Sequence, residues 1–266
     1  MTELATHHTL PAGPGLHELP AAGLHHVRLA LARVAAGAGP ITLQTHADEA
    51  LVIVLDAPQG ALIGAGDELF ELPVRTSVFS DEPSAVYAPP DTRLQLHGPL
   101  LAAVFRSPAT PEAAAFAAYA IRPEEVETVR RGSGNFTRRV RDILPASRPA
   151  TRLLAGETIN PPGNWSSSPP HKHDRHAPPE EVALEEIYLF RVQPEQGFGM
   201  QLSYSNDPPA DRAIVVRDLD AVTIPAGYHP VVAGPGYGLY YLWCLAGQGR
   251  ELQWYPDPAH AWVETS

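Results

Sequence analysis

The sequence predicts an all-β protein of two strand-rich units in tandem, joined by a short helical connection. Hydrophobic residues make up 44% of the chain and charged residues 18%, a composition too apolar for disorder. The 29 Pro and 21 Gly interrupt the sequence too often for long helices. Short apolar or alternating runs recur between these interruptions, which is typical of an antiparallel sandwich or barrel. A chain of 266 residues is long enough for two units that each bury a core.

We assign residues 1–125 to the first unit and residues 126–266 to the second. In the first unit the strand candidates are HHVRLALARV, ALVIVLD, SAVYAPP, TRLQLHG and LLAAVFR. In the second unit they are RLLAGETI, EEIYLFRV, GFGMQLSYS, RAIVVRD, AVTIPAG and GLYYLWCLAG. Between Pro111 and Leu144 the segment PEAAAFAAYAIRPEEVETVRR is rich in helix formers, and Pro123 begins a second turn. We expect the helical connection in this segment.

Charge and composition exclude several classes of protein. Lys and Arg number 19 against 30 Asp and Glu, and the net charge of -11 disfavours nucleic-acid binding. No apolar run reaches the length of a membrane span, and the N-terminus lacks the basic and apolar regions of a signal peptide. The single Cys244 can form neither a disulfide framework nor a thiolate metal cluster. We therefore expect a cytoplasmic protein without membrane or nucleic-acid partners.

Three segments of the second unit carry residues suited to metal binding: PPHKHD, LEEIYLFR and PAGYHP. Side chains alternate along a strand, so His171 and His173 project to the same face. A carboxylate and a third imidazole from other strands would complete a set of four N/O ligands and leave positions open for substrate or water. Glu186 and His229 can supply these two ligands.

The segments resemble the two motifs of the cupin superfamily, an H-x-H followed by a Glu and a P-x-G-x-x-H; Pro225, Gly227 and His229 correspond to the second motif, with one residue instead of two between Gly227 and His229. Twelve residues separate His173 from Glu186, more than the few that are usual in cupins, so a loop must bulge between them. We prefer Glu186 as the ligand because Tyr188 and Phe190 share its face. Glu185 would point the other way. Two further alternatives in the Pro-rich loop are Glu180 and Glu181.

The similarity extends to a narrower family. GETINPPGNWSSSPPHKHD, LEEIYLFRVQPEQGFGMQ, IPAGYHPVVAGPGYGLYYLW and DPAHAW resemble the bacterial 5-deoxy-glucuronate isomerases of myo-inositol catabolism, which are related to the 4-deoxy-L-threo-5-hexosulose-uronate ketol-isomerases. The resemblance implies two tandem cupin barrels (double-stranded β-helices or jelly rolls), of which the first is degenerate and the second binds one divalent transition metal. Zinc, manganese, iron and nickel are all compatible with these ligands. It also implies interconversion of 5-deoxy-D-glucuronate and 2-deoxy-5-keto-D-gluconate, so the expected partner is a small deoxyuronate.

Such an isomerisation needs a polarised carbonyl and a base that moves a proton between adjacent carbons. Glu186, Glu185 and Lys172 are the catalytic candidates, and Asp174 is a further possible base. Lys172 is the only lysine, but alternation turns it away from the metal face, which favours a structural ion pair. The candidates for substrate binding are Arg175, Gln201, Tyr204, Tyr241 and Trp243, with Arg212, Arg138 and Arg139 as further cations.

Two other functions fit the same residues. A cupin dioxygenase would use a similar ligand set and consume oxygen, whereas a non-catalytic sugar-binding bicupin would show no turnover. The sequence contains neither a G-x-G-x-x-G motif nor a P-loop, and so suggests no dinucleotide or nucleoside triphosphate cofactor. It leaves open whether the protein forms a homo-oligomer.

Overall fold

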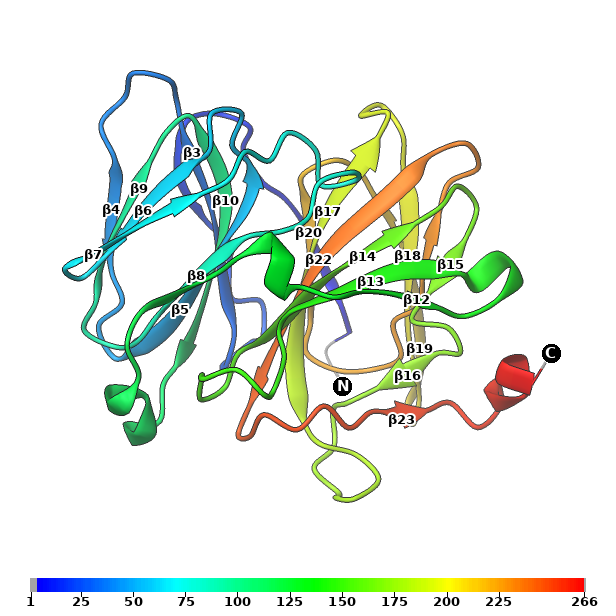
Figure 1. Ribbon diagram of the computed structural model, residues 1–266. Coiled ribbons are helices and arrows are strands. Elements are labelled where there is room, and N and C mark those ends of the chain that lie inside the picture. Colours follow the sequence, from blue (N-terminus) through cyan, green and yellow to red (C-terminus); the bar gives the residue numbers. More distant parts are fainter. Residues whose placement is uncertain (1–3, 266) are drawn as a thin grey trace.

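The computed structural model describes residues 4–265, and this part of the chain folds almost entirely into antiparallel β-sheets (Figure 1). Every strand candidate named from the sequence lies on a strand. Four short 3-10 helices complete the secondary structure of the described residues: η1 (Pro111–Ala115), η2 (Pro123–Glu125), η3 (Gly134–Phe136) and η4 (Ala261–Thr265).

The first half of the chain forms a sandwich of two sheets. The larger sheet contains, in spatial order, β11 (Tyr119–Ile121), β8 (Ala85–Ala88), β5 (Asp48–Asp56), β10 (Leu100–Pro108), β3 (Arg28–Val34) and β2 (Gly15–Glu18). The smaller sheet contains β4 (Ile41–Gln44), β9 (Arg93–His97), β6 (Ala61–Ala65) and β7 (Glu68–Leu72).

The second half forms another sandwich, closed at one end by a short strand pair. Its larger sheet contains β1 (Thr6–Thr9), β20 (Asp220–Ile224), β17 (Leu184–Gln193), β22 (Gly238–Gly247), β14 (Leu154–Asn160), β13 (Arg138–Leu144) and β12 (Thr128–Arg131). Its smaller sheet contains β15 (Trp165–Ser166), β21 (Val231–Ala233), β18 (Gly199–Asn206) and β19 (Pro209–Val216). The pair is β16 (His171–Lys172) with β23 (Tyr255–Pro256), and in Figure 1 it lies below the second sandwich.

The strand β1 departs from the expected division at residue 125. It crosses to the second sandwich and pairs with β20, so that Thr6 lies opposite Thr223. The remaining strands divide between β11 and β12, that is, between residues 121 and 128.

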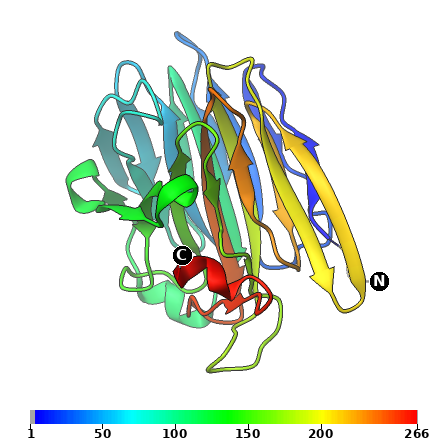
Figure 2. The ribbon, with the colours of Figure 1, turned by 90° about the vertical axis from the view of Figure 1, so that its right-hand side faces the viewer.

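The two larger sheets pack against each other, so their central strands are buried on both faces. In β3, Leu29 and Leu31 belong to a core that also contains Ile187 and Leu189 of β17, whereas Ala30 belongs to the core inside the first sandwich. The alternate residues of β17 complete the pattern, because Tyr188 and Phe190 lie in the core inside the second sandwich. Two-sided burial explains the nearly continuous apolar runs such as ALVIVLD. Figure 2 shows the sheets of the two halves stacked.

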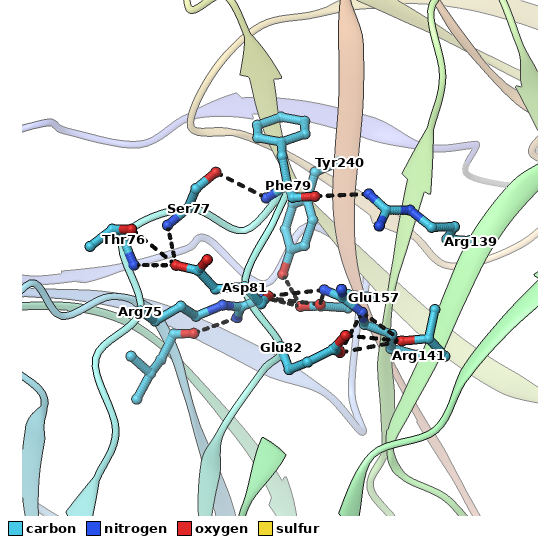
Figure 3. Close-up of polar contacts among 12 residues, drawn as sticks. Arg75, Thr76, Ser77, Phe79, Asp81, Glu82, Arg139, Arg141, Glu157 and Tyr240 are labelled. Carbon is cyan, nitrogen blue, oxygen red and sulfur yellow. Dashed lines mark hydrogen bonds and ion pairs between the residues drawn. The ribbon is translucent and has the colours of Figure 1, made fainter. Parts of the chain in front are cut away.

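A buried ionic network links the two halves (Figure 3). Glu157 of β14 is fully buried and accepts hydrogen bonds from Arg75 of the first half at 2.8 Å and from Arg141 of β13 at 2.8 Å. The Tyr240 hydroxyl donates to the same carboxylate at 2.8 Å. Both arginines are only 1% exposed, so the single carboxylate is shared by two buried cations. These contacts fix the larger sheets relative to each other.

The expected helical connection is largely replaced by strands. Pro123 begins η2, as predicted, but the Ala-rich PEAAA forms only the 3-10 helix η1. Tyr119–Ile121 then pairs with β8, and Arg138–Leu144 belongs to the large second sheet. Pairing with sheet edges therefore overrides the helix propensity of this segment. In residues 4–265, no helix is long and apolar enough to cross a membrane.

Candidate metal centre

Three histidines meet at the end of the second sandwich. His171 lies on β16, His173 follows it, and His229 lies just before β21. One ring nitrogen of each lies within 4.8 Å of the others. The turn that delivers His229 depends on Gly227, which has a φ of +91° and whose missing Cβ would lie 2.7 Å from the Tyr204 carbonyl oxygen. Only glycine fits this turn without strain, which explains the glycine two residues before His229.

Two of the imidazoles are oriented by carbonyl groups behind them. His173 Nδ1 lies 2.8 Å from the Leu184 carbonyl oxygen, and His229 Nδ1 lies 2.8 Å from that of Gly227. Because a carbonyl oxygen only accepts hydrogen bonds, we assign the ring proton to Nδ1 in both. The lone pairs of both Nε2 atoms are then free for a ligand, as in histidines that bind metals. His229 Nε2 is buried and makes no hydrogen bond.

Glu186 of β17 adds a carboxylate to this cluster. Its Oε2 lies 3.2 Å from His173 Nε2 and 3.3 Å from His229 Nε2, and the side chain is buried. Burial raises the pKa of Glu186, but the adjacent His173 and His229 rings outweigh burial and lower that pKa to about 2. Burial also lowers the pKa of His171 well below its usual value, which keeps that ring neutral. Three clustered imidazoles and an ionised carboxylate are ligands that a divalent metal accepts, so these residues fit one.

A cavity of about 140 Å³ adjoins the cluster. The indole of Trp254, in the segment before β23, lies with its ring centre 5.3 Å from that of His171 and covers one side of the cavity. The lining residues come from β12, β13, β14, β16, β17, β22, the segments on either side of β16 and the segment before β23: Arg131, Arg138, Val140, Asp142, Thr158, Ser167, His171, His173, Glu186, Tyr188, Tyr241, Trp243, Leu245, Leu252 and Trp254.

The candidates for substrate binding separate into two groups. Tyr241 and Trp243 line the cavity, as their shared face on β22 suggests. Gln201 is fully buried on β18, and neither atom of its amide has a hydrogen-bond partner, but it does not line the cavity. Tyr204 lies on the opposite face of β18, and its hydroxyl donates to Asp257 Oδ2 at 2.7 Å. The expectation that Tyr204 faces the metal site is therefore wrong.

Glu185 and Lys172 also lie away from the cavity. The Glu185 carboxylate accepts hydrogen bonds from the backbone amides of His25 and His26 at 2.6–2.9 Å, on the face of β17 opposite Glu186. Lys172 Nζ donates to Asp174 and Glu181, which gives it the structural ion pairs that alternation favoured. The catalytic roles suggested for Glu185 and Lys172 are corrected by these positions.

The alternative metal ligands, Glu180 and Glu181, also lie outside the cavity that adjoins the histidines. The same is true of Arg175, the first candidate for a substrate-binding cation. Glu181 is held by Lys172 and by the amides of Asp174 and Arg175, and Glu180 lies exposed in the same loop. Arg175 is exposed and lies beside Glu180 and Glu181, outside the cavity that adjoins the histidines.

The three further candidate cations differ in whether they reach the cavity. Arg212 donates to the Ala5 carbonyl oxygen, and Arg139 donates to that of Phe79. Arg138 is the one sequence candidate among them that lines the cavity.

Sequence reasoning missed Arg131, Asp142, Ser167 and Trp254, which all line the cavity. Arg131 ends the segment expected to be helical, and Asp142 lies in the stretch that follows it. Their strands carry an alternation that could have revealed them, because Arg138, Val140 and Asp142 occupy every second position of β13.

Fold and site together define a protein of two tandem cupin domains whose second domain carries a histidine cluster able to hold a metal. Oxalate decarboxylase from Lactobacillus farciminis, a cupin at only 12% identity, shows the shared fold with a TM-score of 0.64 over 100% of this chain and 91% of that chain. The chain belongs to the KduI/IolB family, whose sequence pattern matches residues 16–263.

Curated relatives are named 5-deoxy-glucuronate isomerase. The protein of Geobacillus thermodenitrificans is 49% identical over 146 residues, which are 55% of this chain and 53% of that protein. The chain thus spans about half the length of the first curated relatives that it matches. The Lacticaseibacillus casei protein is 37% identical over 221 residues, 82% of this chain and 80% of that protein. The crystal structure of an IolB-like protein from Salmonella typhimurium LT2 superposes with a TM-score of 0.91 at 32% identity, over 98% of both chains.

Proposed function

We propose that the protein is a metal-dependent aldose–ketose isomerase that converts 5-deoxy-D-glucuronate to 2-deoxy-5-keto-D-gluconate in myo-inositol catabolism. The observation that carries the proposal is the cluster of His171, His173 and His229 beside Glu186, with two ring nitrogens directed away from their backbone carbonyl partners. The curated names of its relatives support the reaction. The substrate is a small sugar acid, and we place the reaction in the cytoplasm.

His171, His173, His229 and Glu186 would hold one divalent metal, for which zinc, manganese, iron and nickel are the candidates. When bound, such a metal supplies Lewis-acid polarisation of the substrate carbonyl. The Leu184 and Gly227 carbonyl groups orient two of the ligands through hydrogen bonds of 2.8 Å, so the site is arranged before substrate arrives.

The reaction moves hydrogen within the substrate and needs no oxidant. The aldehyde carbon gains a proton, the neighbouring carbon loses one, and the hydroxyl proton moves from the second oxygen to the first. Two carboxylates line the cavity, Glu186 and Asp142, and we assign the transfer between the carbons to one of them. Burial raises the pKa of Asp142, while Arg131 opposes this effect; the pKa of Glu186 is lowered instead, so Asp142 is the better suited of the two to take up a proton.

Two variants separate these roles. Glu186→Gln is expected to lower metal content together with turnover. Asp142→Asn is expected to keep one metal per chain and to lose turnover if Asp142 transfers the proton. Full turnover in Asp142→Asn would assign the transfer to Glu186.

An anaerobic assay of the purified protein with 5-deoxy-D-glucuronate tests the proposed function. We expect the ketose to form without oxygen and its formation to stop after treatment with a chelator, then to return when the metal is restored. Product that forms only with oxygen would instead indicate a cupin dioxygenase. Binding of the sugar acid without turnover would indicate a sugar-binding protein.

A further inference from the structure

The hairpin of β12 and β13 forms one wall of the cavity, and alternation divides its arginines between two faces. Arg138 points into the cavity, whereas Arg139 and Arg141 point toward the first sandwich, where they donate to the Phe79 and Asp81 carbonyl oxygens. Arg131 pairs directly with Arg138 across the two strands and therefore lies on the same face. Both Arg131 and Arg138 line the cavity. Two guanidinium groups thus face the space beside the histidine cluster.

Like charges placed directly opposite each other on a sheet destabilise it. The arrangement is also unusual for an acidic chain with a net charge of -11, in which carboxylates outnumber the cations. Asp142 lines the same cavity, four positions or about 13 Å beyond Arg138 along β13, and Arg131 is near enough to lower its pKa, so two guanidinium groups accompany this carboxylate. The paired arginines therefore make one region of this cavity locally positive.

The loop of the hairpin holds the Arg138 side chain in place. Arg138 Nη1 donates to the Phe136 carbonyl oxygen at 3.1 Å. Gly132 has a φ of +74°, and a Cβ on it would lie 2.7 Å from Arg138 Nη1 and 2.3 Å from the Phe136 oxygen. A glycine at this position thus leaves room for the guanidinium group. A preorganised Arg loses less conformational entropy when it binds an anion.

We propose that Arg138, with Arg131 beside it, binds the carboxylate of the sugar acid and thereby sets both the specificity for uronates and their orientation. The identity of the ligand rests on the proposed function. An open-chain uronate carries its reacting carbonyl at one end and its carboxylate at the other. The cavity has the matching polarity, with the imidazoles and Glu186 in one wall and the arginines in another. A guanidinium group forms two parallel hydrogen bonds with a carboxylate, a geometry that a neutral hydroxymethyl group cannot match.

Calorimetric titration of the metal-loaded protein with D-glucuronate and D-glucose tests the proposal, because these sugars differ only in carboxylate against hydroxymethyl. A hydrogen bond to a charged group corresponds to roughly tenfold to a hundredfold in affinity. We expect the wild-type protein to bind D-glucuronate at least about tenfold more tightly than D-glucose. Arg138→Gln should abolish this preference, and Arg138→Lys should restore part of it. Arg130→Gln is the matched control, since Arg130 is exposed on β12, pairs with Arg139 on the face opposite Arg131 and Arg138, and should leave the preference intact.

Steady-state kinetics with 5-deoxy-D-glucuronate give a second measurement. Arg138→Gln should raise KM at least about tenfold with unchanged metal content and melting temperature, because the carboxylate is remote from the reacting carbons. Equal binding of the two sugars by the wild type, or a preference that persists in the Arg131→Gln/Arg138→Gln double variant, would overturn the proposal. If the wild type and Arg138→Gln both convert 5-deoxy-D-glucuronate with the same KM, the carboxylate site is overturned and the proposed function stands. A preference for glucuronate that depends on Arg138, in a protein without isomerase activity, would support the carboxylate site and refute the proposed function.

Discussion

Replacement of Glu157 by Gln should strongly destabilise the protein, because this residue is the shared anion of the network between the two sandwiches. The carboxylate is 0% exposed and accepts hydrogen bonds from Arg75, Arg141 and Tyr240 at 2.8–2.9 Å. Gln has nearly the same shape but no charge, so two buried guanidinium groups lose their common partner. Removing one member of a buried ion pair costs about 3–5 kcal/mol. For a chain of this size, that corresponds to a fall in melting temperature of about 6–20 °C.

Scanning calorimetry of the wild type, Glu157→Gln and Glu82→Gln measures this effect. Glu82 pairs with Arg141 at 2.8 Å, but its side chain is 43% exposed, so its replacement should cost no more than about 1 kcal/mol. A Glu157→Gln protein that melts within about 2 °C of the wild type would refute the stabilising role of the network. Equal losses in the two variants would show that burial does not set its strength.

Three further variants test the positions of particular residues. Glu185→Ala should lower the free energy of unfolding by about 1–3 kcal/mol, because the hydrogen bonds to the His25 and His26 amides are lost. Its kcat should stay unchanged, and a large loss of kcat would show that Glu185 takes part in catalysis. Gly156→Ala should lower kcat/KM by displacing Trp243, whose Cζ2 would lie 2.3 Å from the new Cβ. Gly39→Ala is the control, because nothing lies within 4 Å of its Cβ, and it should leave kcat/KM unchanged. Equal kcat/KM in the two variants would show that Trp243 does not shape the site. Backbone hydrogen bonds led by that from the Thr76 amide lower the pKa of Asp81 to about 2 from 3.8, so its contribution to stability is present above pH 4 and is lost as the pH falls toward 2. Asp81→Asn should flatten this part of the acid-unfolding curve, and an unchanged curve would contradict the assignment.

Residue periodicity and motif spacing were sufficient to predict the central strands and the histidine cluster. Apolar runs such as ALVIVLD reflect burial on both faces of a strand, and the turn at Gly227 leaves a recognisable spacing before His229. Alternation also separated Glu186 from Glu185. The same rule divides Gln201 from Tyr204, which occupy opposite faces of β18 and could not both face the metal site.

The walls of the cavity were less predictable, because they depend on pairing between distant segments. The helix propensity of the segment around Ala115 is overridden when Tyr119–Ile121 pairs with β8. Expecting a helical connection there concealed β12, its pairing with β13 and the position of Arg131 in the cavity wall. Trp254 enters the site from near the C-terminus, through a strand pair only two residues long, which carries no periodicity of its own.

The stoichiometry of bound metal in the wild type and in His229→Ala, measured together with anaerobic turnover, tests the central claim most directly. His176→Ala is the matched control, because His176 is exposed in the loop between His173 and Glu186. We predict one divalent metal per chain and ketose formation in the wild type and the control, and loss of both in His229→Ala. One metal per chain retained by His229→Ala, or undiminished ketose formation by metal-free wild-type protein, would contradict the account.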